Sequence, residues 1–83
     1  MRQRCGIMVS DIQTWKIWIG QQKYDAYEGM VLKIKIQNRY YQACLGKDQH
    51  EWFVTIEHDV TFNLRIFEVY KVQIASVDLN PNV

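Results

Sequence analysis

The most regular feature of the chain is an alternation of apolar and polar residues between Gly29 and Glu57. Alternation with a period of two puts successive side chains on opposite sides of a β-strand. It divides into three runs, residues 30–36, 40–45 and 52–56. The links between these runs are short and polar, so each run is expected to pair with the next as a hairpin. The side chains expected to face inward are Met30, Leu32, Ile34, Ile36, Trp52, Val54 and Ile56.

A fourth strand is predicted from residues 14–19. Trp15, Ile17 and Ile19 fall on one side and are expected to be buried, whereas Thr14, Lys16 and Trp18 fall on the other. Before it, Ile7, Val9 and Cys5 share a period-two face, so residues 1–13 form either a short strand or a frayed end with a helical turn at 10–13.

Other segments leave their phase or role open. In 40–45 either Tyr41, Ala43 and Leu45 or Tyr40, Gln42 and Cys44 face the core, and the first set is the more apolar. Gly20–Glu28 is expected to be a surface loop, in which Tyr24 and Tyr27 either shape a binding face or cap the core. His58–Asn63 is expected to be a polar connection. The run 64–74 needs a bend or a helical turn near Phe67-Glu68 before a final strand over 70–75, because a straight strand would turn Glu68 inward.

Five or six short, locally connected strands predict an all-β fold, a small antiparallel SH3-like barrel. Helical periodicity fits no long segment. The 83 residues are too few for two cores, so one domain spans 1–83, with 1–13 and 78–83 expected at its periphery.

Charge and composition narrow the classes of partner. The formal net charge is +1, from ten Lys and Arg against nine Asp and Glu, which provides no global field for nucleic acid or an anionic membrane. No secretory leader and no apolar segment of about 20 residues is present, so we expect no membrane partner and a cytoplasmic location. Two cysteines, Cys5 and Cys44, form at most one bridge and are expected to be reduced thiols.

Enzymatic and metal chemistry lack the residue patterns that they require. Ligand types occur without zinc-like spacing, at Cys5, Cys44, Asp48, His50, His58 and Asp59. Cys44 lies within a strand and neither serine has a local base, so no nucleophile is activated. The glycines are isolated and form no phosphate loop. We therefore expect no catalytic residues, no metal and no cofactor.

Several of the apolar and aromatic positions resemble a known family. The matching residues are Gly29-x-Val31-Leu32, a hairpin through Tyr40-Tyr41, Trp52-Phe53-Val54 and Val72-Gln73-Ile74. Together they resemble a small domain of unknown function that is carried mostly by mobile elements of low-GC Gram-positive bacteria. Phe53 stands where that family usually has Tyr, and Gln73 where it has Arg. The resemblance covers roughly 29–74 and implies an SH3-like barrel in a mobile element, with no catalytic residues to carry over.

Binding to a protein partner is the leading expectation for function. Aromatic anchors for it are Trp18, Tyr24, Tyr27, Tyr40 and Phe53. By analogy with other small proteins of mobile elements, the expected role is inhibition of a host macromolecule, for example as an anti-CRISPR protein. The alternative is single-stranded nucleic-acid binding by Lys16, Trp18, Lys33, Lys35 and Arg39, with the strand of Lys16 and Trp18 expected to lie beside the strand of Lys33 and Lys35. A third class is a self-associating module, so the expected state is a monomer or a homodimer.

Overall fold

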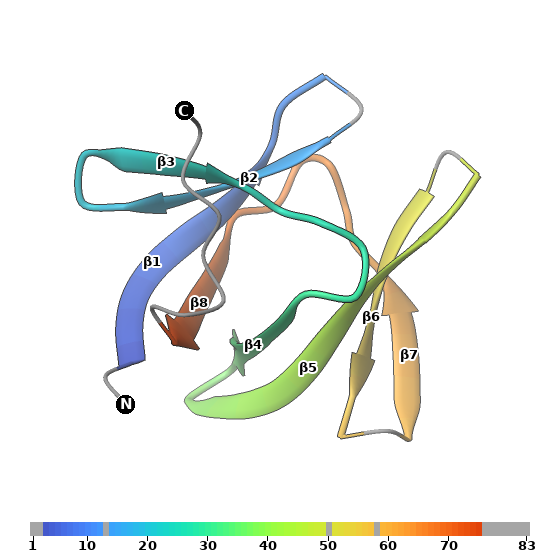
Figure 1. Cartoon of the computed structure of the whole chain (residues 1–83). Coiled ribbons are helices and arrows are strands. Elements are labelled where there is room, and N and C mark those ends of the chain that lie inside the picture. Colours follow the sequence, from blue (N-terminus) through green and yellow to red (C-terminus); the bar gives the residue numbers. More distant parts are fainter. Residues whose placement is uncertain (1–2, 13, 50, 58, 76–83) are drawn as a thin grey trace.

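The computed structural model describes residues 3–12, 14–49, 51–57 and 59–75, and within them the chain forms eight strands and no helix (Figure 1). The all-β prediction is therefore confirmed. The strands are β1 (Gln3–Ser10), β2 (Trp15–Ile19), β3 (Gln22–Asp25), β4 (Val31–Ile36), β5 (Arg39–Asp48), β6 (Glu51–Ile56), β7 (Val60–Asn63) and β8 (Tyr70–Ala75).

All eight strands belong to one antiparallel sheet with the order β3-β2-β1-β8-β4-β5-β6-β7. Strands β1 to β3 form one meander and β4 to β7 form another. Strand β8 joins the two meanders: it pairs with β1 from Gln3↔Ala75 to Met8↔Tyr70, but with β4 only at Lys33↔Gln73 and Ile34↔Val72. Strands β3 and β7 lie at the two edges, so the sheet is open.

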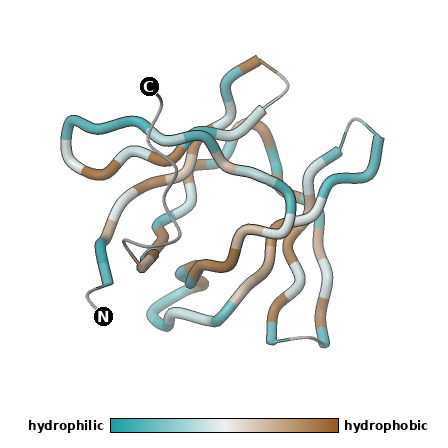
Figure 2. Tube along the Cα trace, viewed as in Figure 1, coloured by the Kyte–Doolittle hydropathy of each residue, from teal (hydrophilic) through white to brown (hydrophobic). Residues whose placement is uncertain are grey.

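The sheet curls around a single hydrophobic core to which both meanders contribute. Figure 2 shows apolar and polar positions alternating along the strands, the pattern expected when one face is buried. The connection 26–30 closes one end of this core, because the N–H of Ala26 donates to the carbonyl of Trp15 (3.0 Å) and the N–H of Gly29 donates to that of Leu45 (2.7 Å). The core comprises Met8, Trp15, Ile17, Ile19, Tyr24, Ala26, Met30, Leu32, Ile34, Ala43, Leu45, Trp52, Val54, Ile56, Leu64, Val72 and Ile74.

The predicted inward faces are confirmed with one exception. Trp15, Ile17 and Ile19 are buried, as are Trp52, Val54 and Ile56, and Met30, Leu32 and Ile34. The prediction for Ile36 was wrong, since its side chain is 36% exposed. Ile36 is the last residue of β4 and is followed by the turn residue Gln37, whose φ is +60°. Ile36 therefore lies at the end of the hairpin, where the core no longer covers its side chain.

The structure decides between the alternatives that the sequence left open for residues 40–45, for residues 64–74 and for the N-terminal segment. Ala43 and Leu45 are buried and Tyr41 packs against the core, so the more apolar set of β5 faces inward. The bend before β8 is present, with the N–H of Glu68 donating to the carbonyl of Arg65 (3.0 Å). At the N-terminus the strand alternative is correct. Strand β1 lies inside the sheet, with Met8 on the core face, and residues 78–83 lie outside the described part.

Two segments interpreted as connections contain strands, which raises the number from the expected five or six to eight. Strand β3 lies within Gly20–Glu28 and β7 within His58–Asn63. Each is an edge strand of four residues with one side chain packed on the core, Tyr24 in β3 and Phe62 in β7. A single inward residue gives no period-two signal, which is why the sequence pattern did not reveal them.

Candidate functional site

The two predicted tyrosines of the 20–28 segment belong to the core. Tyr24 is buried, and Tyr27 is half-buried and packs against the core cluster. The capping alternative therefore describes both rings, and Tyr24 presents no surface to a partner. Phe53 is half-buried on β6 opposite Gly46 of β5. Its ring fills the space that a side chain at position 46 would need.

The basic residues expected to lie on neighbouring strands are separated. Lys16 and Trp18 are on β2, whereas Lys33 and Lys35 are on β4, and strands β1 and β8 lie between them. The expectation that these strands are adjacent was wrong because β1 pairs with β2 and β8 then inserts between β1 and β4. Lys16 also forms an ion pair with Asp25.

Four predicted site residues take part in three cation–π contacts. The ammonium of Lys23 lies 5.7 Å from the ring of Trp18, and that of Lys35 lies 5.9 Å from the ring of Tyr40. Both rings are on the outer face of the sheet. The guanidinium of Arg39 lies 5.5 Å from the ring of Tyr41, whose ring packs on the core. Arg39 is therefore on the opposite side of the β4–β5 hairpin from Lys35.

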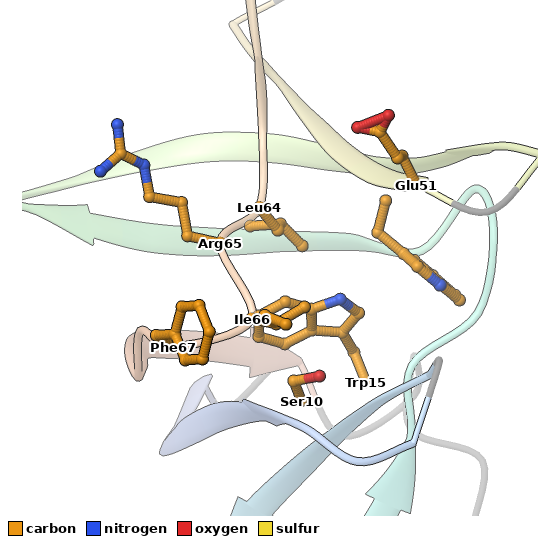
Figure 3. Close-up of a pocket in the computed structure, with 8 residues that line it drawn as sticks. Ser10, Trp15, Glu51, Leu64, Arg65, Ile66 and Phe67 are labelled. Atoms are coloured by element: carbon orange, nitrogen blue, oxygen red, sulfur yellow. The ribbon is translucent and has the colours of Figure 1, made fainter.

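A pocket of about 340 Å³ lies where the β1–β2 and β7–β8 connections meet the start of β6. This volume is at the lower end of the range for ligand pockets and suits one or two side chains. Figure 3 shows Leu64 and Ile66 pointing to the side of Trp15, while Arg65 and Phe67 point to the other side of the connection. The pocket is lined by Ser10, Trp15, Glu51, Trp52, Leu64, Arg65, Ile66 and Phe67.

The connections around this pocket carry large apolar side chains in water. Phe67 is 94% exposed, Ile66 63% and Val69 59%, all between β7 and β8. Ile12 is 89% exposed and lies between Ser10 and Trp15, two residues of the pocket. Strand amphipathicity does not explain them, because none is in a strand. We call Ile12, Ile66, Phe67 and the pocket the loop-end surface.

The turn that presents Ile66 and Phe67 is anchored at both ends. The N–H of Leu64 donates to the carbonyl of Trp52 (2.9 Å), and the N–H of Arg65 donates to the hydroxyl of Tyr70 (2.9 Å). The side chain of Leu64 is buried in the core. The two exposed apolar side chains are thus held out by a defined backbone.

Ile12 occupies a backbone conformation that β-branched residues seldom adopt. Asp11 and Thr14 exchange two backbone hydrogen bonds (2.9 and 3.3 Å), so Ile12 lies in the tight hairpin loop that these bonds close. Its φ is +46°. Such loops favour Asn or Gly, and the left-handed region costs other residues about 1–2 kcal/mol. An exposed Ile at this position contributes nothing to the core in return.

One polar group of the pocket lacks a partner. The Nε1 of Trp52 is buried and has no hydrogen-bond acceptor among the described residues. A buried donor left unpaired costs about 1–3 kcal/mol. The ammonium of Lys47 lies 5.7 Å from the centre of the same indole. The pocket therefore has apolar walls, and Trp52, one of its lining residues, carries a buried donor without an acceptor among the described residues.

Metal-ligating residues do not gather in the described part of the chain. No group of three His, Cys, Asp or Glu side chains there could hold an ion, and His50 and His58 lie outside it. Cys5 accepts a contact from Gln73 Nε2 (3.6 Å), and Cys44 lies within β5 with its Sγ 3.8 Å from the Leu45 carbonyl oxygen.

The loop-end surface was missed at the level of sequence. The bend was predicted near Phe67-Glu68 because Glu68 would otherwise face inward, and that conflict of phase was itself the available signal. Two bulky apolar residues in a turn have no core to face, so they are candidates for contact with another molecule.

The fold and this surface define the class of protein as a single-sheet, all-β protein with an apolar pocket beside exposed loop residues. Comparison with models of known protein families, with curated proteins and with solved structures gave no match. No helix in the described residues is long and apolar enough to cross a membrane.

Proposed function

We propose that the chain is a non-catalytic binding protein that engages a partner protein through the loop-end surface. The observation that carries this proposal is the exposure of Ile66 and Phe67, which line a pocket large enough for a side chain. Ile12, also exposed, belongs to the connection between the lining residues Ser10 and Trp15. Ordered aromatic and aliphatic residues next to a pocket are the usual anchors of protein interfaces. Folding alone gives Phe67 no stabilising contact, whereas docking would remove its ring from water.

The chemistry of the pocket specifies what the partner presents. An apolar side chain fits between Trp15 and Leu64, both of which line the pocket and are buried. A carbonyl or carboxylate oxygen beside it would accept the free N–H of Trp52. Glu51 and Arg65 at the rim carry opposite charges, so they orient a partner rather than select one sign of charge.

The resemblance to a domain of mobile elements supports a specific setting for this activity. The partner is then a host protein in the bacterial cytoplasm, such as a CRISPR effector, and binding inhibits it. The same resemblance supports the interpretation of the open, curled sheet as a variant of an SH3-like small barrel. Binding residues are often carried on loops that a rigid scaffold positions, as proposed here.

The test is a paired affinity capture from a host lysate with matched surface variants. The double variant Ile66→Ser/Phe67→Ser removes the anchors, and Val60→Ser makes the same kind of change at an exposed apolar residue of edge strand β7. We expect a partner that is recovered with the wild type and with Val60→Ser and is lost with the double variant. Recovery of the same proteins with all three would refute the proposal.

Self-association through the same surface is the competing outcome. Size-exclusion chromatography with light scattering distinguishes it, because a dimer that the double variant dissolves would make a second copy the occupant. A monomer at all concentrations, together with the partner above, supports the proposal.

A further inference from the structure

A second surface lies on the outer face of the sheet and is independent of the loop end. The strand registers place side chains from six neighbouring strands in one row, because Trp18 pairs with both Lys23 and Ile7, Ile7 with Lys71, and Lys35 with Tyr40. Continued one position beyond Ile34↔Val72, the register of β8 with β4 brings Lys71 next to Lys35, and both lysines line one shallow depression. The row runs Lys23, Trp18, Ile7, Lys71, Lys35, Tyr40. At about 4.8 Å between strands it is about 24 Å long. We call it the lysine–aromatic row.

The outer face is basic although the whole chain is nearly neutral. The outward positions of β3, β2, β1, β8, β4 and β5 carry five lysines. The same positions carry two carboxylates, Asp25 and Asp48. Asp25 pairs with Lys16. Most of the opposing charge is elsewhere, for example at Glu57 and Asp59, beyond β5. The lysines are Lys16, Lys23, Lys33, Lys35 and Lys71.

Lys35 and Lys71 are the two lysines of the outer face whose positive charges are least neutralised by nearby carboxylates. They are cross-strand neighbours of like charge, which is a destabilising arrangement. Neither has a carboxylate partner among the described residues. An anion bound between them would relieve this repulsion, and Gln37 and Asn38 on the same depression supply further polar groups.

An aromatic ring lies beside a lysine at each end of the row. Trp18 is 36% exposed and Tyr40 is half-buried, and each has a lysine about 6 Å from its ring. Flat rings among cations on an open sheet suit bases that can stack on the rings while the phosphates contact the lysines. Bases in a duplex are already stacked on one another, so this arrangement favours a single strand.

We infer that the lysine–aromatic row binds single-stranded nucleic acid without sequence preference. Trp18 and Tyr40 stack on bases, and Lys23, Lys71 and Lys35, with Lys33 beside them, contact phosphates. Lys16 forms an ion pair with Asp25, and Arg39 faces the other side of its hairpin. We therefore leave Lys16 and Arg39 out of the nucleic-acid-binding residues that the sequence suggested. The inference does not depend on the loop-end surface.

The test is fluorescence anisotropy of the full chain with a labelled oligothymidylate of about 16 nucleotides. Four phosphate contacts predict about 50-fold weaker binding at 200 mM than at 50 mM salt. The variant Lys35→Ala/Lys71→Ala is expected to lower the salt slope by about 1.4 and to weaken binding. Trp18→Ala is expected to weaken it by about 5- to 150-fold, whereas Trp18→Phe retains most of the affinity.

Two controls separate this site from general charge and from the loop end. Lys47→Ala removes the same charge from the opposite face of β5, and Phe67→Ser changes the loop-end surface; neither is expected to alter binding of the oligonucleotide. Circular dichroism and the thermal midpoint confirm that each variant is folded. Three results would overturn the inference: no salt-sensitive binding by the wild type, equal affinity for a duplex, or binding to phosphatidylserine vesicles but not to the oligonucleotide.

Discussion

The indole ring of Trp15 packs against the phenol ring of Tyr70, with the ring centroids 5.7 Å apart and the planes inclined by 58°. Trp15 lines the pocket, and the hydroxyl of Tyr70 accepts the backbone N–H of Arg65. This pair therefore connects β2, β8 and the turn that carries Ile66 and Phe67. The position of the exposed side chains depends on a contact inside the sheet.

Removal of the Tyr70 hydroxyl tests this connection. We expect Tyr70→Phe to lower the free energy of unfolding by about 0.5–1.5 kcal/mol, because the ring packing is kept while one hydrogen bond is lost. Urea denaturation measures the change. Tyr40→Phe is the control, since the Tyr40 hydroxyl has no protein hydrogen bond among the described residues. Equal stability of the two variants would show that the bond to Arg65 contributes nothing.

Ile12 is expected to be a site of stored strain. Asn tolerates a positive φ, so Ile12→Asn should raise the free energy of unfolding by about 1 kcal/mol and increase the thermal midpoint. The same variant should weaken partner binding if Ile12 contributes to the loop-end surface. Ile66→Asn, at an exposed residue whose φ is not positive, should give no such stabilisation. A lower midpoint for Ile12→Asn would contradict the assignment.

Two glycines allow close approach of neighbouring strands, and they should differ in their tolerance of a methyl group. A Cβ at Gly6 would collide with the backbone carbonyl of Trp18, whereas a Cβ at Gly46 would collide with the ring of Phe53. A backbone yields less readily than a side chain, so Gly6→Ala should cost about 3 kcal/mol or more and Gly46→Ala about 1–2 kcal/mol.

A double-mutant cycle checks the second part of this prediction. Phe53→Ala removes the ring that Gly46→Ala would strike, so the two changes together should cost less than the sum of their separate effects. Additive costs would mean that the ring is not the obstacle.

Lys71→Glu should change stability and nucleic-acid binding in opposite directions. A carboxylate beside Lys35 converts a repulsive cross-strand pair into an attractive one, with a gain of about 0.2–1 kcal/mol. The same change removes a phosphate contact and adds a repulsive charge, so affinity for the oligonucleotide should fall. Thermal denaturation and anisotropy on the same sample measure both. Loss of stability with unchanged affinity would contradict the position given to Lys71.

The sequence predicted those parts of the fold that repeat with a period of two on adjacent strands. Trp15, Ile17 and Ile19 were assigned correctly, as was the inward face of β6, because each strand shows three apolar residues in phase. Strands β3 and β7 were not predicted, because each has only one side chain that packs on the core, Tyr24 in β3 and Phe62 in β7. A pattern needs at least two matching positions to be visible.

The candidate sites were harder to predict because they depend on which strands become neighbours. Lys35 and Lys71 are 36 positions apart in the sequence. They meet only because β8 inserts between β1 and β4. Periodicity assigns a side chain to a face but does not assign neighbours to a strand. The same limit kept Lys23 and Lys71 out of the predicted set and placed Lys16 beside Lys33.

The insertion of β8 has a consequence for how the polypeptide acquires its form. Neither meander can join the other until β8 has been made, because the strand that they share is synthesised after both of them. Until then β1 and β4 each present an unpaired edge. Strands β1 and β8 pair across more than 60 positions of the sequence, and such long-range pairing is slow to nucleate. A chain interrupted before β8 would therefore expose two meanders with unpaired strand edges, which favour aggregation and proteolysis.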